Sequence, residues 1–463
     1  KLEPDRLDMP SIYGEPAVVK RIEYRTEVRK VTSNSTVAAA TMVMAALLAL
    51  VVANSPAHEI VEKFFEAECS FTVGAFTVSI SFESFINDFL MAIFFLLVGI
   101  ELKYEVTVGQ LRKPRQAMLP MLAAVGGVAV PACIYLLCNY GGAMHGWATP
   151  IATDIAFALG VMSLLGSRIS TQTKVFFQTL AIADDILAIV VIAFFYGQTP
   201  DIAWCAAALG VILVLWGMSR MKLYSSAPYL FVGLILWICM YHSGIHATLA
   251  GVILAFFLPS RSDVRLNHLG GWLEGRAREL NANYDDEHHI LGQHDFTRSA
   301  LRVEHVMHHV TPPLQRVERY VSVPVNFIIL PLFAFANAQV TLMGSDFGSI
   351  VLNPVAYGTF FGAVIGKPVG IILTTFILVK LGICKLPKRV NWMQITAVGL
   401  MGGLGFTMSI LISGLAFSDQ NNVLAAKCAI LAGSIAASLL GIAFVRVADI
   451  LHDATKERPS DKK

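Results

Sequence analysis

The chain has 463 residues, of which 55% are hydrophobic and only 15% are charged. Soluble globular proteins carry about 25% charged residues, so this composition excludes an ordinary soluble protein and indicates a polytopic membrane protein. The formal net charge of +2 is too small to suggest a nucleic-acid partner. We also expect no cofactor, and the seven cysteines, which show no CxxC spacing, are expected to be packing residues.

The apolar runs predict an all-α polytopic membrane protein with about twelve transmembrane helices, because a bilayer core about 30 Å thick needs about 20 apolar residues per helix. They divide the chain into a polar tail at 1–35, a helical part at 36–258, a loop at 259–319, a second helical part at 320–450 and a tail at 451–463. The expected spans are 36–54, 86–108, 116–138, 148–165, 173–196, 201–219, 226–242, 244–258, 320–341, 353–381, 392–416 and 422–450.

The positive charges of the connecting segments support this count. With the loops between consecutive spans numbered in chain order, Lys and Arg occur in both tails and in every even-numbered loop. The odd-numbered loops carry none, apart from Lys63 among several glutamates. Lys and Arg are enriched on the cytoplasmic side of bacterial membrane proteins. We therefore expect a multi-pass protein of a bacterial inner membrane with both termini in the cytoplasm.

Two connecting segments stand out. Residues 69–83 alternate enough, around a glycine, to suggest a small extracytoplasmic β-hairpin. Residues 259–319 form a long cytoplasmic loop with 8 Arg, 9 acidic residues and 7 of the 12 histidines. These histidines could sense pH or bind a metal, but the composition favours a solvated, disordered linker.

Four ionisable residues lie well inside the predicted spans: Asp154, Asp184, Asp185 and Lys367. Each charge at membrane depth costs about 2.5–3.5 kcal/mol on insertion scales, or about 10–14 kcal/mol for the four. One lysine cannot neutralise three aspartates. The remaining acidity therefore favours a site for a mobile cation or for protons.

Asp184 and Asp185 are adjacent in the otherwise apolar stretch LAIADDILAIVV. Neighbouring helical residues point about 100° apart, and carboxylates about 6 Å apart repel by about 2.8 kcal/mol at an effective dielectric constant of about 20. We therefore expect the two to titrate as a coupled pair, at least one of them near neutral pH. Such a pair holds protons at one pH and a cation at a higher pH. Hard cations such as Na⁺ prefer oxygen ligands, and Thr153 offers a hydroxyl beside Asp154.

Two spans look interrupted. Residues 148–165 contain Pro150, Thr153, Asp154 and Gly160. Residues 398–413 contain the sequence GGLGFT, and its candidate broken-helix residues are Gly402, Gly403, Gly405 and Thr407. Close helix packing through small residues is the simpler alternative for the second segment. However, the two are the middle members of spans 3–5 and 10–12, and interrupted helices at matching positions of two repeats are a mark of transporter binding sites.

The predicted topology makes these two triplets inverted repeats, because span 3 starts inside and span 10 starts outside. Two opposed broken helices bring N-termini to N-termini and C-termini to C-termini. We expect Asp154 to compensate the partial positive ends and Lys367 the partial negative ends.

With these features, the chain resembles the bacterial NhaA-type sodium/proton antiporter family. The resemblance rests on stretches that run in order through spans 2 to 11. They are FFLLVGIELKYE, TPIATDIAFALGV, LAIADDILAIVVIAFFY, SGIHATLAGV, ILPLFAFANA, GKPVGI and GGLGFTMSILIS.

The resemblance implies that Asp185 is the main carboxylate for cation and proton, with Asp184 beside it. It implies that Asp184 pairs with Lys367 in a proton-loaded state, and that Asp154 with Thr153 neutralises the crossing and assists the site. It further implies that Glu101, Glu318 and His246 take part in the pH response, although a packing role for the histidine is an alternative.

The expected function is electrogenic exchange of Na⁺ or Li⁺ for protons by alternating access, with a homodimer implied by the resemblance alone. This is a secondary active transporter rather than an enzyme. A cation-coupled organic-anion carrier of the same architecture is the first alternative, but three aspartates at the site would repel an anion. An intramembrane aspartyl protease is the second, but its two aspartates must face each other across helices.

Overall fold

The computed structural model describes residues 15–32, 34–73, 76–197, 199–341, 347–387 and 390–456. In this part of the chain, ten helices are long and apolar enough to cross a membrane, and the bent pair described below makes an eleventh span. The predicted all-α, multi-span fold is therefore confirmed. The chain forms two compact units, Lys1–Glu83 with Lys113–Val191 and Asn326–Lys463, and Ser84–Arg112 with Ile192–Val325.

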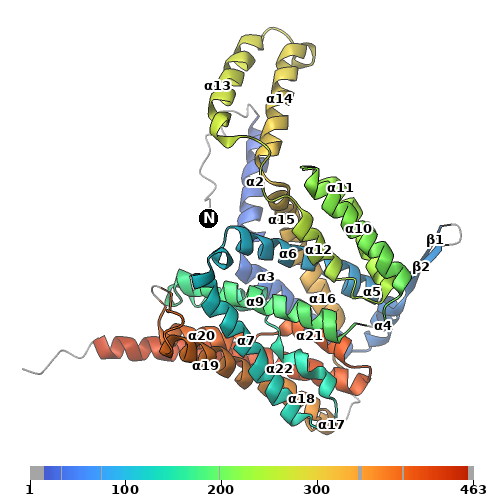
Figure 1. Ribbon diagram of the computed structural model, residues 1–463, viewed down its shortest axis with the longest axis vertical. Helices are drawn as coiled ribbons and strands as arrows, with labels where there is room; N and C mark the ends of the chain where they lie inside the picture. Colours follow the sequence, from blue (N-terminus) through green and yellow to red (C-terminus); the bar gives the residue numbers. More distant parts are fainter. Residues whose placement is uncertain are drawn as a thin grey trace, which may run out of the picture. The chain divides into compact units, whose positions relative to one another are not determined.

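The first unit holds both predicted triplets (Figure 1). Its first part comprises α2 (Pro16–Thr32), α3 (Ser35–Ala53), α4 (His58–Glu66), β1 (Glu68–Val73), β2 (Phe76–Ser81), α7 (Pro114–Cys138), α8 (Ile155–Leu164) and most of α9 (Thr171–Phe195). Its second part comprises α16 (Leu330–Asn337), α17 (Phe347–Val351), α18 (Pro354–Phe361), α19 (Lys367–Lys380), α20 (Trp392–Gly402), α21 (Phe406–Ala416) and α22 (Gln420–Lys456).

Glycines let the two triplets pack closely. Helices α7 and α19 lie side by side (Figure 1), and a Cβ atom added at Gly370 would lie 2.1 Å from the carbonyl oxygen of Gly126. Such close approach of two backbones is the usual role of glycine in membrane helices. Around this contact, buried apolar residues from both triplets, among them Phe177 and Met401, form one continuous core.

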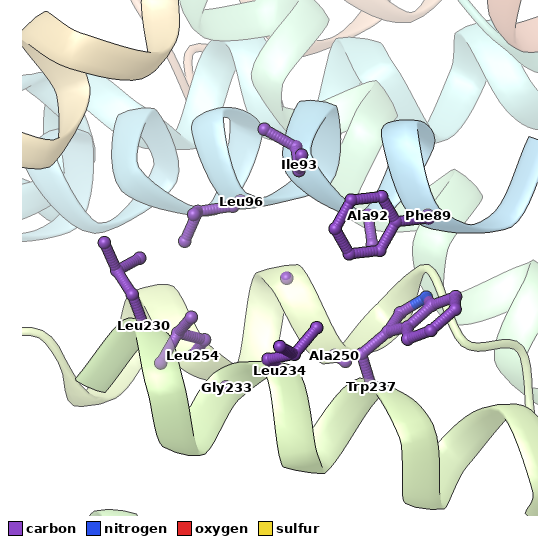
Figure 2. A pocket seen from close by; sticks show the side chains of 11 residues that line it. Phe89, Ala92, Ile93, Leu96, Leu230, Gly233, Leu234, Trp237, Ala250 and Leu254 are labelled. Atoms are coloured by element: carbon purple, nitrogen blue, oxygen red, sulfur yellow. The ribbon is translucent and has the colours of Figure 1, made fainter. Parts of the chain in front are cut away.

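Among the described residues, the second unit contains seven α-helices of two turns or more and a π-helical turn. They are the turn Phe85–Leu90, which follows α5 (Phe82–Ser84), then α6 (Met91–Thr107), α10 (Ile202–Arg220), α11 (Ser226–Ser243), α12 (Leu249–Phe257), α13 (Leu266–Asn283), α14 (His294–Val310) and α15 (Pro313–Pro324). An apolar pocket of about 250 Å³ lies between α6, α11 and α12. Phe89 and Trp237 face each other in its lining (Figure 2), and their ring centroids are 5.0 Å apart.

The predicted β-hairpin is present, as β1 and β2 pair antiparallel from Glu68 opposite Ser81 to Val73 opposite Phe76. Its turn, at 74–75, lies outside the described residues. The predicted span 244–258 is reduced to the nine residues of α12. A helix of nine residues is only about 14 Å long, too short to cross the bilayer core alone.

The interpretation of 259–319 as a disordered linker is wrong, because α13 and α14 occupy most of this segment. The following span also begins seven residues earlier than predicted, since α15 starts at Pro313 and continues through a π-helical turn into α16. Helices also occur within the predicted tails, namely α2 at the N-terminal end and the last turns of α22.

Candidate functional site

The first interrupted span is broken just before Asp154. Residues Met144–Ile151 form a 3₁₀ helix, the backbone is extended at Ala152, and α8 starts after Asp154, which is its N-cap. The Asp154 Oδ1 atom accepts a hydrogen bond from the backbone N–H of Phe157 at 3.0 Å. Aspartate is a preferred N-cap because it satisfies a backbone N–H that has no partner within the helix.

The second interrupted span is broken at its glycines. Helix α20 ends at Gly402, α21 begins at Phe406, and the two halves are bent by 43°. A Cβ atom added at Gly405 would lie 2.8 Å from the carbonyl oxygen of Ala152, and one at Gly403 would lie 2.6 Å from that of Ala363. Close approach to neighbouring backbone therefore explains why glycine occupies these two positions.

The two breaks cross at Asp154. Its backbone N–H donates to the Leu404 carbonyl at 2.6 Å. Its Oδ2 atom accepts hydrogen bonds from the Thr407 hydroxyl at 2.6 Å and from the Thr407 backbone N–H at 3.2 Å. The carboxylate, only 3% exposed, thus lies at the N-terminal ends of both α8 and α21. A negative charge at this point opposes the partial positive charge of both helix ends.

Lys367 occupies the complementary position. It is the first residue of α19, directly after the π-helical turn Gly362–Gly366, and its side chain is completely buried. Its Nζ atom donates a hydrogen bond to the carbonyl of Ile151, the last residue of the 3₁₀ helix. The ammonium group therefore lies at the C-terminal end of that half-span, where the partial charge is negative.

The same ammonium group forms a buried ion pair with Asp184 of α9, at 2.9 Å between Nζ and Oδ2. The Thr153 hydroxyl lies 2.8 Å from this Oδ2 atom and 3.0 Å from the Gly402 carbonyl oxygen. It has a single hydrogen to donate between these two acceptors. Asp184 thus connects α9, α19 and both interrupted spans.

Asp184 and Asp185 are 1% and 3% exposed, respectively. The Oδ1 atom of Asp184 is buried and accepts no hydrogen bond from any described residue, so one carboxylate oxygen is available to a ligand. The site therefore brings Asp184, Lys367, Thr153 and Asp154 together, with Asp185 adjacent to Asp184 along α9. Carboxylate, hydroxyl and carbonyl oxygens are the ligands that hard cations prefer.

The three residues expected to act in the pH response all belong to the second unit. Helices α6 and α15 pack together, and the carboxylates of Glu101 and Glu318 lie close enough to repel each other. The Nε2 atom of His246 lies 2.8 Å from the Tyr196 carbonyl oxygen, within hydrogen-bond distance. This contact suits a packing role for the histidine.

Sequence reasoning missed the backbone carbonyls of Ile151, Gly402 and Leu404, because nothing in a sequence shows which carbonyls a broken helix will expose. It also missed Lys103, whose Nζ atom donates to the carbonyls of Phe256 at 2.6 Å and Leu258 at 2.5 Å, at the end of α12. A lysine near the end of a long apolar run was the available signal. Within the described ranges, no group of three or more His, Cys, Asp or Glu residues could hold a metal ion.

Comparisons with known proteins identify the family of the chain. The family model described as Na⁺/H⁺ antiporter 1 matches residues 29–445. The Na⁺/H⁺ antiporter NhaA of Helicobacter pylori (strain ATCC 700392 / 26695) is 41% identical over 413 residues, which cover 87% of this chain and 91% of that protein. The Na⁺/H⁺ antiporter NhaA of Janthinobacterium sp. (strain Marseille) is 42% identical over 409 residues, which cover 87% of this chain and 89% of that protein.

A solved structure of the sodium proton antiporter MjNhaP1 from Methanocaldococcus jannaschii at pH 8 is 12% identical. The match covers 92% of this chain and 98% of that one, with a TM-score of 0.46, a likeness too distant to support an argument. The curated relatives are antiporters rather than anion carriers or enzymes, so the two alternative functions are not favoured. From the family match and the identity over most of its length, the chain belongs to the Na⁺/H⁺ antiporter 1 family, with NhaA-type antiporters as its relatives.

Proposed function

We propose that this antiporter exchanges Na⁺ or Li⁺ for protons electrogenically, and that Asp184 and Asp185 form the shared site. The observation that carries the proposal is the buried ion pair of Lys367 with Asp184, with the Thr153 hydroxyl on the same carboxylate oxygen. An ammonium group already occupies the place where a metal cation would find its oxygen ligands.

Competition for the carboxylate of Asp184 couples the entry of a cation to the release of protons. A Na⁺ or Li⁺ ion bound by Asp184 and Asp185 must compete with Lys367 for the Oδ2 atom of Asp184, and with protons for both carboxylates. Because two acids and one lysine share the site, more than one proton can leave when one cation enters. Exchange of this kind moves net charge, so its rate depends on the membrane potential.

Asp154 and Thr407 have a different role in the proposal. They hold the two half-helix N-termini against each other, so that the crossing keeps its geometry while the site opens to one side of the membrane and then to the other. Irregular backbone at membrane depth is tolerated only where it lines a cavity or is buried in protein. Alternating access would therefore move the spans around this fixed crossing.

The location and assembly are part of the same proposal. The distribution of Lys and Arg supports a bacterial inner membrane with both termini in the cytoplasm. The β-hairpin supports a homodimer, because a two-stranded sheet has strand edges that can pair with those of a second copy. The repulsion between Glu101 and Glu318 supports a role for these two carboxylates in the response to pH.

The test is proton release in everted vesicles from cells that lack other antiporters. The vesicles are energised, NaCl, LiCl or KCl is added, and a pH-sensitive dye reports dequenching between pH 6 and 9. We expect Na⁺ and Li⁺ to give a signal with the wild type and none with Asp185→Asn. Repeating the assay with the membrane potential clamped by valinomycin and K⁺ should slow an electrogenic exchanger.

Asp201→Asn is the matched control. Asp201 caps α10 through its side chain, which accepts from the Ala203 N–H at 2.8 Å, and asparagine caps a helix about as well as aspartate. We expect this variant to transport like the wild type. A folded wild-type protein that shows no response to any alkali cation would overturn the proposal and leave the organic-anion carrier to be tested.

A further inference from the structure

Helices α13 and α14 lie side by side as a hairpin (Figure 1), and a pocket of about 420 Å³ is lined by residues of both helices. Pockets that hold small molecules have volumes of about 300–1,000 Å³. We call this one the hairpin pocket. It shares no residue with the aspartate site, so the proposed ion exchange gives it no role.

The hairpin pocket is held in shape by polar contacts in the turn and between the two helices. The side-chain amide of Gln293, which is 9% exposed, donates to the carbonyls of Asp285 at 2.5 Å and His288 at 2.7 Å. The hydroxyl of Ser299 on α14, a buried residue, donates to the Glu279 carboxylate on α13 at 2.8 Å. The walls of the pocket are therefore fixed before any ligand binds.

The lining combines positive charge with an aromatic ring. None of its residues is acidic, and they include Trp272 and Arg276 from α13 and Arg298, Leu301, Arg302 and His305 from α14. The four residues from α14 follow the spacing i, i+3, i+4 and i+7 of one helical face. Three guanidinium groups therefore gather beside one indole ring.

Two carboxylates outside the lining hold these arginines in place. Glu279 forms ion pairs with Arg276 and, at 3.9 Å between Oε1 and Nη1, with Arg302. Asp295 lies 3.5 Å from Arg298. Three guanidinium groups against two carboxylates leave an excess of positive charge. A guanidinium group has five donor hydrogens, so each arginine can keep its carboxylate and still donate to an anion.

The indole of Trp272 distinguishes the hairpin pocket from a simple patch of charge. The tryptophan is partly exposed, and the guanidinium carbon of Arg276 lies 5.8 Å from the ring centroid. Aromatic side chains stack on nucleobases of every kind, and arginines bind phosphate groups through paired hydrogen bonds. Inorganic phosphate would use only the arginines, whereas a ligand with a planar ring and phosphate groups uses the arginines and the indole together.

We propose that the hairpin pocket is a binding site for a nucleoside di- or triphosphate. The base stacks on Trp272, and the phosphates receive hydrogen bonds from Arg276, Arg298 and Arg302. Arg298 and Arg302 are about 6 Å apart along α14, a spacing that suits consecutive phosphate groups. Because stacking does not distinguish the bases, we expect ATP and GTP to bind equally. This is a second site on the antiporter, and it does not depend on the proposed function.

The test is isothermal titration calorimetry of the full-length protein in neutral detergent micelles, which exclude competition by anionic lipids. We expect ATP and GTP to bind with a dissociation constant below about 1 mM. Tripolyphosphate, which has the charges without the ring, should bind at least about fivefold more weakly. Arg298→Gln combined with Arg302→Gln should weaken ATP binding by about tenfold or more, the loss expected for hydrogen bonds to charged groups.

Trp272→Leu separates the contribution of the ring from that of the charges. It should weaken ATP binding by at least about fivefold, the lower limit for one base–aromatic stack. It should leave tripolyphosphate binding unchanged, which also shows that the hairpin is still folded. Trp272→Phe should recover part of the loss because it keeps an aromatic face. Arg278→Gln is the matched control, since Arg278 is an exposed arginine of α13 outside the lining, and it should bind like the wild type.

Three results would overturn the proposal. The first is a wild type that binds no nucleotide in this range. The second is equal ATP binding by the wild type and Trp272→Leu, which would reduce the pocket to a patch of charge. The third is binding of phosphatidylglycerol vesicles that requires Arg298 and Arg302 and that ATP does not displace, which would make the hairpin a membrane contact.

Discussion

The hydroxyl of Thr407 offers a direct measure of the charge on Asp154. It lies 2.6 Å from Oδ2 of Asp154, a distance typical of hydrogen bonds from a hydroxyl to an ionised carboxylate. Thr407→Val removes this donor and preserves the shape of the side chain. The backbone N–H of Thr407 and that of Phe157 remain on the carboxylate, so the variant tests one hydrogen bond rather than the whole crossing.

The expected loss in the free energy of unfolding depends on whether the acceptor, the Asp154 carboxylate, is charged. A hydrogen bond to a charged group contributes about 1.5–3 kcal/mol, whereas hydrogen bonds between membrane helices average only about 0.6 kcal/mol. We therefore expect Thr407→Val to lower the free energy of unfolding by about 1.5–3 kcal/mol. The assay is reversible unfolding in mixed micelles, and Thr407→Ser should restore most of the loss because it returns the hydroxyl.

Thr396→Val is the control, because the Thr396 hydroxyl donates only within α20, to the Trp392 carbonyl at 3.0 Å. We expect a change of less than about 0.5 kcal/mol, as for most substitutions outside special contacts. A cost near 0.6 kcal/mol for Thr407→Val, equal to the membrane average, would refute the reasoning, since it would mean that Asp154 carries no full negative charge at the crossing.

Two further variants probe the ion pair and the crossing. Lys367→Met leaves Asp184 buried without its cation and should cost about 3–5 kcal/mol in the same unfolding assay; an unchanged stability would show that the pair is not charged. Gly405→Ala places a Cβ atom 2.8 Å from a backbone oxygen of the opposing span and should abolish most transport in the vesicle assay. Gly414→Ala is the control, because nothing lies within 4 Å of its added Cβ atom, and it should transport normally. Equal transport by the two alanine variants would mean that the crossing accommodates a side chain.

The sequence was sufficient to locate the interruptions. A charged residue at membrane depth costs free energy and therefore marks a site, and clustered glycines mark places where the backbone can leave helical geometry. Asp154 and Lys367 were expected at the positive and negative ends of the half-helices, and the structure places them at such ends. The backbone oxygen atoms that Lys367 and Thr153 contact were not predictable. They belong to Ile151 and Gly402, whose side chains carry no information about a free carbonyl.

The segment 259–319 shows the opposite failure. Its charge and histidine content suggested disorder, but apolar residues recur along α14 at Phe296, Val303, Val306 and Val310, with the spacing of one helical face. The periodic signal was present, and composition was given too much weight. The shortness of α12 also had a signal, because Pro259 and Arg261 follow its apolar run on one side and His246 and Thr248 interrupt it on the other.

In the proposed exchange, the ammonium group of Lys367 links ion binding to the position of α19. It contacts Asp184 on α9 and the Ile151 carbonyl at the end of a half-span, and it belongs to α19. A cation that displaces it from Asp184 therefore removes one of two polar contacts that hold α19 against its neighbours. Because the displaced charge is buried, it must move or lose its proton. In that proposal, occupancy of the aspartates and the position of α19 depend on each other, which is the coupling that alternating access requires.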